Sequence, residues 1–282
     1  MNYKMVVNIN AKILLIEAAF MIPALLISFY FNEERASLAY SESILLIAVL
    51  AAVLLFLSKG AERVFYAREG FVCVGLAWIL MSALGCLPFY LSGEIPKYID
   101  ALFEMVSGFT TTGASIVPNV EKLSKSILYW RSFSHWIGGM GVLVFLLAIA
   151  PTDKKSGGFS LHLLRAESPG PSVGKVLPKI KDTAIMTYAV YIGITLIGFI
   201  VYLISGMTLF EASTMIFGTV GTGGFGIYND VLIQTLENNQ HWNDFGYTVL
   251  SGECKIGDQM VIERPIENSP LVISKYPTPD QI

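Results

Sequence analysis

Long apolar segments alternating with short polar ones dominate the pattern of the sequence. The apolar runs occupy residues 13–31, about 41–57, 71–91, about 132–150 and 183–205. Each run approaches or reaches the roughly 20 residues with which a helix crosses a bilayer, so the pattern predicts five membrane-spanning helices. The first run is long and no small-residue cleavage site follows it, which favours a retained helix over a signal peptide.

The segment between the third and fourth runs is of a different kind. Residues 97–109 are apolar, but about 13 residues at 1.5 Å each cannot cross roughly 30 Å of hydrocarbon. The polar stretch GFTTTGASIV, residues 108–117, overlaps its end. We expect a short re-entrant helix followed by an extended return, because non-helical backbone at membrane depth must be buried in protein or line a watery cavity. An ordinary surface loop is the alternative that this segment alone leaves open.

The composition of that return points to ion chemistry. Gly113 allows backbone angles that other residues resist, and an extended TTTG would present carbonyl oxygens in a row. Rings of carbonyls that replace a hydration shell form the filters of potassium channels. The C-terminal end of the short helix also favours cations.

A similar segment occurs a second time. YIDALFEMVSGFTTTGASI, from residue 98, is repeated as LFEASTMIFGTVGTGGFGI, from residue 209. A spacing of 111 residues pairs Thr111 with Thr222 and Gly113 with Gly224, whereas a spacing of 110 pairs Gly113 with Gly223. The register therefore stays open by one residue, but the repeat predicts two pore-loop units.

Basic residues alternate between the loops. They concentrate before the first span, between the second and third, and in the loop 151–182, whereas the opposite loops hold only Arg35, Lys97, Lys122 and Lys125. The positive-inside rule then predicts a multi-pass membrane protein, in contact with lipid, whose N-terminus and 151–182 loop are cytoplasmic.

Composition excludes several function classes. The chain is 54% hydrophobic and 15% charged, with a net charge of −3, and it has no basic stripe of the kind that nucleic acid requires. The three cysteines fit no disulfide or metal framework, and the three histidines are scattered over different compartments. We therefore expect no enzyme, no covalently bound cofactor and no metal beyond potassium. GTGGFG at 221–226 lacks the preceding strand of a nucleotide-binding loop.

Three ionisable residues stand within or near the spans. Arg131 and His135 are one helical turn apart, and an intramembrane charge needs a partner, for which Glu104 or Asp100 is the candidate. Snorkelling of Arg131 to the interface is equally consistent. Glu17, in the first span, leaves a helix contact, an interfacial position and a function open.

The glycines of the fourth run allow two interpretations. Gly138, Gly139 and Gly141 lie close together in one helical segment. Small residues let neighbouring membrane helices approach closely, which favours a packing role; a gating or pore-lining role is the alternative.

Four separated motifs carry a family resemblance. SGFTTTGAS, WRSFSHWIGGMG at 130–141, LRAESPGP at 164–171 and GTVGTGGF together resemble the membrane subunit of the Trk/Ktr potassium-uptake superfamily, over residues 1–230. The resemblance implies four helix–pore loop–helix units around one pore, each with one filter strand. It also implies a location in the plasma (inner) membrane, potassium as the substrate, sodium or a proton as the coupling ion in symport, and a cytoplasmic nucleotide-binding regulatory subunit. A homodimer is a candidate assembly because two paired chains would supply four filter strands.

We accordingly predict an all-α polytopic membrane protein with repeated helix–pore loop–helix units after two extra transmembrane helices. The expected divisions are a two-helix pair at 1–69, a first unit at 70–150, a cytoplasmic loop at 151–181, an incomplete second unit at 182–230 and an atypical polar tail at 231–282. The filter candidates, acting through backbone carbonyls, are Thr110, Thr111, Thr112, Gly113, Gly221, Thr222, Gly223 and Gly224.

The pattern breaks after Asn229. No apolar run of spanning length follows, and QMVIERPIENSPLVIS holds short β-prone patches interrupted by prolines. We expect a truncated, frame-shifted or fused chain that is inactive in potassium uptake on its own. The alternative is a non-transporting membrane scaffold or regulatory fragment that retains the pore-loop fold.

Overall fold

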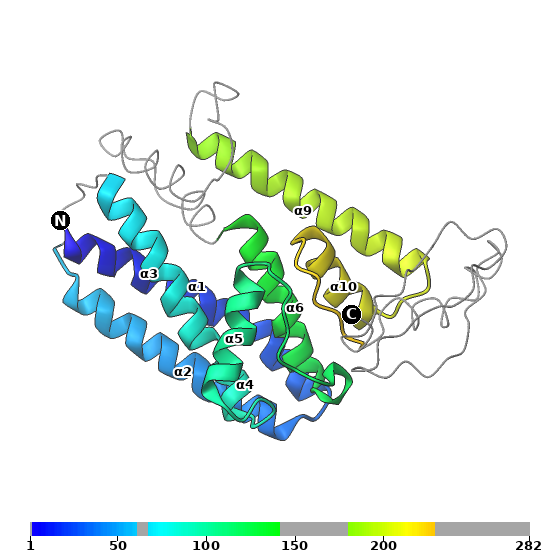
Figure 1. Cartoon of the computed structure of the whole chain (residues 1–282). Helices are drawn as coiled ribbons and strands as arrows, with labels where there is room; N and C mark the ends of the chain where they lie inside the picture. Colours follow the sequence, from blue (N-terminus) through cyan, green and yellow to red (C-terminus); the bar gives the residue numbers. More distant parts are fainter. Residues whose placement is uncertain (1, 61–66, 142–179, 229–282) are drawn as a thin grey trace, which may run out of the picture. The chain divides into compact units, whose positions relative to one another are not determined.

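Long apolar helices form most of the described structure. A computed structural model describes residues 2–60, 67–141 and 180–228. Within these residues, four helical segments are long and apolar enough to cross a membrane: Tyr3–Tyr30, Glu34–Leu57, Glu69–Leu91 and Ile185–Ile204. They correspond to α1 (Tyr3–Tyr30), α2 (Glu34–Leu57), α3 (Ala67–Gly85) continued by α4 (Leu87–Leu91), and α9 (Ile180–Ile204) (Figure 1). The predicted all-α membrane fold is confirmed.

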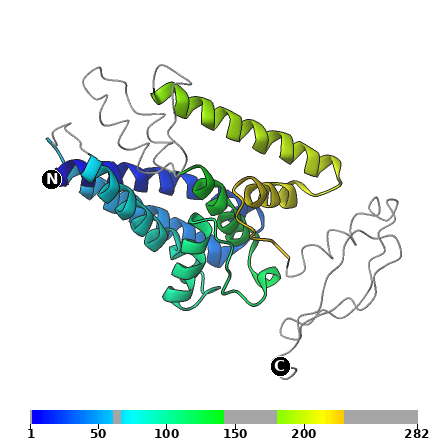
Figure 2. The ribbon, with the colours of Figure 1, turned by 45° about the horizontal axis from the view of Figure 1, so that its top comes forward.

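The first two helices form a hairpin. The buried residues of α2 recur every three or four positions, at Ala36, Ala39 and Tyr40, Ser43, Ile47 and Ala51, which places them on one face of the helix. That face packs on α1, and α3 packs on α1 as well; the two views show these three helices side by side (Figures 1 and 2). Asn32 makes the turn between α1 and α2 with φ 57°, in the left-handed region that asparagine tolerates better than most residues.

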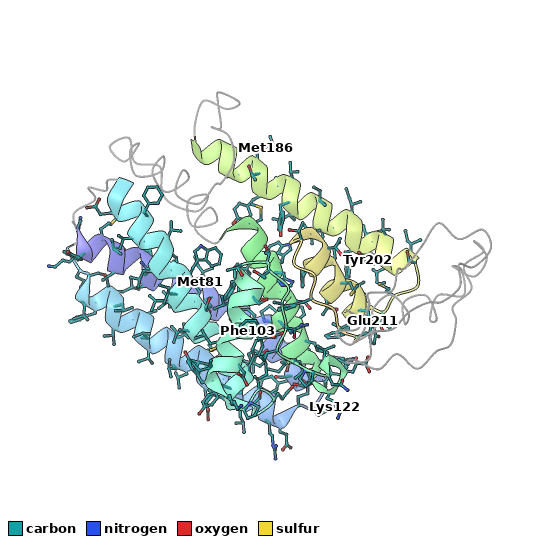
Figure 3. The ribbon with its side chains drawn as sticks, viewed as in Figure 1. Met81, Phe103, Lys122, Met186, Tyr202 and Glu211 are labelled. Atoms are coloured by element: carbon teal, nitrogen blue, oxygen red, sulfur yellow. The ribbon has the colours of Figure 1, made fainter. Side chains whose placement is uncertain are left out.

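Two short helices follow spanning segments. α5 (Tyr98–Phe109) and α10 (Leu209–Val220) have 12 residues each, too few to cross the hydrocarbon. A capping box begins α10: the Thr208 side chain accepts a hydrogen bond from the Glu211 N–H, and the Glu211 carboxylate accepts one from the Thr208 N–H. Figure 3 labels Glu211 at this end of α10. Both short helices pack on α6 (Lys125–Met140), and α10 also packs on α9.

Two acidic residues from distant loops cap the start of α6. The Glu33 carboxylate accepts hydrogen bonds from the N–H groups of Lys125 (2.6 Å) and Ser126 (3.1 Å). The Glu94 carboxylate accepts one from the Ser124 N–H at 2.8 Å and another from the Ser124 hydroxyl. Carboxylates satisfy the free N–H groups and favour the positive end of the helix dipole. These contacts bring the α1–α2 and α4–α5 connections to one end of the helices.

A different set of contacts marks the opposite end. The Asn8 amide donates to the Ser58 hydroxyl at 3.0 Å, and the Asn2 N–H donates to Glu69 at 3.3 Å. The start of α1, the end of α2 and the start of α3 therefore lie together. This alternation of ends agrees with the alternation of basic residues, while the cytoplasmic placement of the N-terminus stays a prediction.

The fourth predicted span differs from the described helix. α6 begins at Lys125, seven residues before the expected start at 132, because the Glu33 and Glu94 caps fix its first turn. It ends at Met140, and Gly141 adopts φ 72°. The remainder of that predicted span, the loop 151–181 and the tail 231–282 lie outside the described residues.

The contacts divide the chain into two units, residues 1–227 and 228–282. All helices named above belong to the first unit. Apart from Tyr228, the second unit lies outside the described residues.

Candidate functional site

The backbone after α5 and the backbone after α10 make the same turn. In each copy the first three residues after the helix donate their N–H groups back to carbonyl oxygens of its last turn. The bonds are Thr110 to Val106, Thr111 to Gly108 and Thr112 to Ser107 after α5, and Gly221 to Phe217, Thr222 to Thr219 and Gly223 to Gly218 after α10. Each bond of the second copy is displaced by 111 residues from its counterpart in the first.

Left-handed backbone angles confirm this register. Thr111 and Thr222 have φ 53° and 54°, and Gly113 and Gly224 have φ 76° and 87°. A β-branched residue at positive φ is a rare, unfavourable conformation that persists only where surrounding structure imposes it. Its recurrence at equivalent positions selects the spacing of 111 over 110.

The turn also changes the expected course of the first filter segment. Extended backbone was expected across TTTG, but Thr110 and Thr111 belong to the turn that closes α5, and the non-helical strand runs from Thr112. The local reason is that the free carbonyls at the helix end accept hydrogen bonds from the N–H groups of the threonines. The Thr110 hydroxyl donates to the Val106 carbonyl at 2.7 Å and lies 2.8 Å from the Thr112 hydroxyl.

The two strands approach each other at their glycines. A Cβ atom on Gly113 would overlap the carbonyl oxygen of Gly223, so a side chain does not fit between the strands. Four of the predicted filter residues are exposed at this place: Thr110, Thr112, Thr222 and Gly224. The structure thus brings the two predicted filter segments together although more than 100 residues separate them in sequence.

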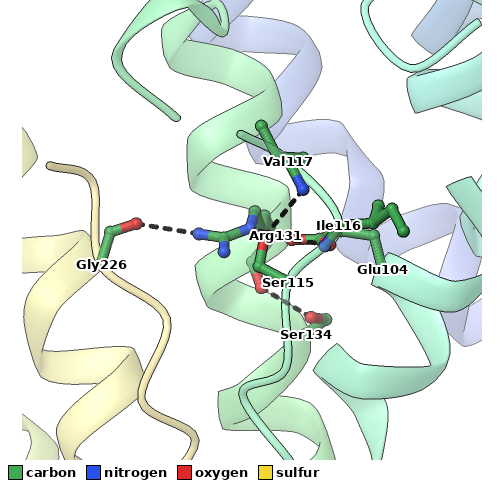
Figure 4. A network of polar contacts seen from close by, with 7 residues as sticks. All are labelled: Glu104, Ser115, Ile116, Val117, Arg131, Ser134 and Gly226. Atoms are coloured by element: carbon green, nitrogen blue, oxygen red, sulfur yellow. Dashed lines mark hydrogen bonds and ion pairs between the residues drawn. The ribbon is translucent and has the colours of Figure 1, made fainter. Parts of the chain in front are cut away.

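A buried ion pair connects both strands to α6. The Glu104 carboxylate of α5 accepts hydrogen bonds from the Ser115 hydroxyl (2.9 Å) and the Ile116 N–H (2.9 Å) of the first strand. It also accepts the Nε–H of Arg131 at 2.5 Å, and Arg131 Nη1 donates to the Gly226 carbonyl of the second strand at 2.8 Å (Figure 4). One pair of side chains therefore holds both strands.

Burial decides between the two predictions for Arg131. Glu104 is 0% exposed and Arg131 3% exposed, so the arginine does not snorkel to the interface. Its partner is Glu104, one of the two predicted candidates, and not Asp100.

Phe225, in the second strand, packs against the guanidinium of Arg131. The guanidinium carbon of Arg131 lies 3.6 Å from the centroid of the Phe225 ring, and the His135 ring stacks on the same ring at 4.1 Å. Gly223 lies directly against His135, leaving no room for a Cβ. The sequence analysis did not predict a role for Phe225. The residue is present in the sequence as the aromatic position that ends the motif GTVGTGGF.

Glycines of α6 let the helix contact the ends of both short helices. A Cβ atom on Gly138 would overlap the carbonyl oxygen of Phe109, and one on Gly139 would lie 2.9 Å from the Gly221 Cα. Close approach of backbones is the usual reason for small residues between membrane helices. These contacts support the packing interpretation of the glycines, and they place α6 against the starts of both predicted filter segments.

Comparison with known proteins identifies the family. The family model TrkH, described as a cation transport protein, matches residues 37–235. The chain belongs to the TrkH family. Relatives include the Trk system potassium uptake protein TrkH of Halomonas elongata, 32% identical over 231 residues (81% of this chain, 47% of that protein). Another is TrkH of Escherichia coli K12, 31% identical over 224 residues (78% and 45%).

A solved structure agrees with this family assignment. The crystal structure of the potassium transporter TrkH from Vibrio parahaemolyticus matches with a TM-score of 0.67 and 27% identity, over 81% of this chain and 45% of that chain. An uncharacterised cation transporter of Methanocaldococcus jannaschii is 30% identical over 257 residues (90% and 50%). The chain spans about half the length of the curated relatives it matches. The resemblance to the Trk/Ktr superfamily is confirmed, while the individual filter residues stay predictions.

Proposed function

We propose that the chain builds part of the wall of a potassium-uptake pore in the plasma membrane. The backbone carbonyls of Thr110, Thr111, Thr112 and Gly113, and of Gly221, Thr222, Gly223 and Gly224, are the proposed ion ligands. The observation that supports this proposal most strongly is that one strained turn recurs at a spacing of 111 residues. The two segments that contain it meet at Gly113 and Gly223. Strained backbone that recurs in this way is expected at functional sites.

The chemistry follows from the ends of the two short helices. The C-terminal turns of α5 and α10 lead directly into the strands, and the partial negative charge of each helix end favours a cation beside it. Carbonyl oxygens then replace the water that the ion loses. The Glu104–Arg131 pair adds little net charge to the site because its two charges cancel. It acts by holding the strands at a set separation.

Potassium is the proposed ion because the relatives from Halomonas elongata and Escherichia coli are named potassium uptake proteins. A coupling ion, sodium or a proton, and a cytoplasmic nucleotide-binding regulatory subunit are further proposals that rest on the family alone. A homodimeric assembly is proposed because two chains would supply four filter strands. A closed carbonyl ring requires more strands than the two described here.

A chimera tests the proposed ion ligands. Residues 1–227 replace the matching part of the Vibrio parahaemolyticus TrkH, and potassium and sodium uptake are measured in cells without other potassium transporters. We expect potassium uptake by the chimera, a loss of discrimination against sodium with Gly113→Ser, and a smaller change with Thr112→Ser, which keeps the backbone unchanged. A chimera that reaches the membrane and carries no potassium, or a Gly113→Ser variant with unchanged selectivity, would refute the proposal.

A further inference from the structure

Glu17 occupies an unusual position within α1. Its side chain is 0% exposed, and both carboxyl oxygens lack a hydrogen-bond partner among the described residues. Buried polar groups in proteins almost always have such a partner. A carboxyl group with neither donor nor cation near the middle of a spanning helix therefore requires an explanation.

The carboxyl points toward the first pore helix. A Cβ atom built on Gly85, the last residue of α3, would lie 2.6 Å from Glu17 Oε1, 3.4 Å from Met105 Cγ and 3.1 Å from Phe109 Cε2. Met105 and Phe109 belong to the C-terminal half of α5, directly before the first filter strand. Glu17 thus lies where α1, α3 and the pore helix meet, and the absent side chain of Gly85 provides its space.

The titratable groups of the surrounding helices contact residues other than Glu17. Cys86, next to Gly85, is the neighbouring titratable group, and its thiol donates to the Ala83 carbonyl at 3.3 Å. On the helices packed around α1 and α3, Tyr40 donates to the Ser126 carbonyl, Arg131 pairs with Glu104, and His135 lies against Phe225. None of these supplies a positive charge or a donor to the Glu17 carboxyl in the described part of the chain.

Comparison with Glu104 shows what this implies for the charge of Glu17. Both carboxyls are 0% exposed, but Glu104 has a guanidinium, a hydroxyl and an N–H as donors. An ionised carboxylate in the position of Glu17 would lose its hydration and gain nothing in return, which is among the most unfavourable arrangements in a protein. The neutral acid avoids this loss.

We propose that Glu17 is a proton-binding site, occupied by a proton in the helix packing seen here. Release of the proton requires water or a donor to reach the carboxyl, and therefore a separation of α1 from Gly85 and from the end of α5. The protonation of Glu17 is thus linked to the packing of the first pore helix. This inference goes beyond the proposed potassium pathway and stands without it.

Infrared spectroscopy of the 282-residue protein in lipid nanodiscs tests the site directly. At neutral pH we expect the carbonyl stretch of a protonated carboxylic acid, slow to shift in heavy water because the group is buried. The band should disappear in Glu17→Gln and persist in the matched control Glu42→Gln, which removes an exposed carboxyl from α2. Glu17→Asp, which keeps an acid on a shorter side chain, should shift the band and confirms the assignment even if the glutamine variant folds poorly.

Other outcomes would overturn the proposal. A spectrum without the acid band at neutral pH, or a band that is unchanged in both Glu17 variants, would show that Glu17 is ionised. A band that appears only after potassium and sodium are removed would replace the proton by a metal cation. Thermal unfolding adds a second readout: Glu17→Gln should leave the midpoint nearly unchanged because amide and acid are both neutral, and a large loss would argue for an anion.

Discussion

The replacement Glu104→Gln tests whether one ion pair holds both proposed filter strands. The carboxylate accepts hydrogen bonds from the Ser115 hydroxyl, the Ile116 N–H and the Arg131 Nε–H, the last at 2.5 Å. Glutamine preserves the shape but offers one carbonyl oxygen, and its amide N–H groups face donors where acceptors are needed. At least one buried donor is then left unsatisfied, and the guanidinium loses its counter-charge.

The size of the effect follows from the burial of the pair. Removing one partner of a buried ion pair destabilises a protein by about 3–5 kcal/mol, and Glu104 and Arg131 are 0% and 3% exposed. Since glutamine keeps one acceptor, we expect a loss near the lower end, about 3 kcal/mol. Arg131→Met should cost a similar amount, because it leaves the carboxylate uncompensated. The double variant should cost less than the sum, with an interaction energy of about 1–3 kcal/mol.

Equilibrium unfolding of the purified chain measures these free energies. The chain is titrated with a denaturing detergent in mixed micelles, and the loss of helix is followed by circular dichroism. The control Glu42→Gln, at an exposed position of α2, should stay within about 0.5 kcal/mol of the parent chain. A Glu104→Gln variant as stable as this control, or a double variant whose cost equals the sum of the two single ones, would refute the bridging role.

Three further predictions concern the cap, the support of the second strand and the topology. Burial raises the pKa of Glu94 above its usual 4.5, against the hydrogen bonds from Ser124 that lower it; a raised folded pKa contributes stability that is lost as pH rises through it. Glu94→Gln should therefore become more stable relative to the parent chain as the pH rises from below 4.5 to neutral. Unfolding titrations at each pH measure this difference in stability, and a difference that does not change with pH would contradict the prediction. In the same assay, Phe225→Ala should lower the free energy of unfolding by about 3 kcal/mol, and Phe225→Leu should lower it clearly less. The Phe225 ring packs on the guanidinium and on the imidazole, so equal losses in the two variants would contradict a role of the ring itself. Cysteines at Lys59 and Lys122 should react with an impermeant thiol reagent from opposite sides of the membrane, and labelling of both from one side would disprove the topology.

The sequence by itself determined the elements whose cause is local. Hydrophobic length separates the spanning helices from the 12-residue α5 and α10, because a bilayer requires about 20 residues whatever the helix packs against. The sequence also predicted that residue 113 needs a glycine, because the expected backbone angles are ones that other residues resist. Its φ of 76° agrees with this. The start of α6 was not readable, because Glu33 and Glu94, which cap it, come from remote loops.

Only the tertiary structure decided the contacts between distant segments. The sequence left two registers of the repeat open, and the positive φ of Thr111 and Thr222 selected one of them. Asp100 and Glu104 were equal candidates as the partner of Arg131 until the packing of α5 on α6 placed Glu104 beside it. The same holds for Glu17: its sequence shows an acid in an apolar helix, but whether a donor reaches that acid depends on which faces of α3 and α5 meet α1. Such juxtapositions arise from side-chain packing between segments far apart in the chain, for which local propensity carries no information.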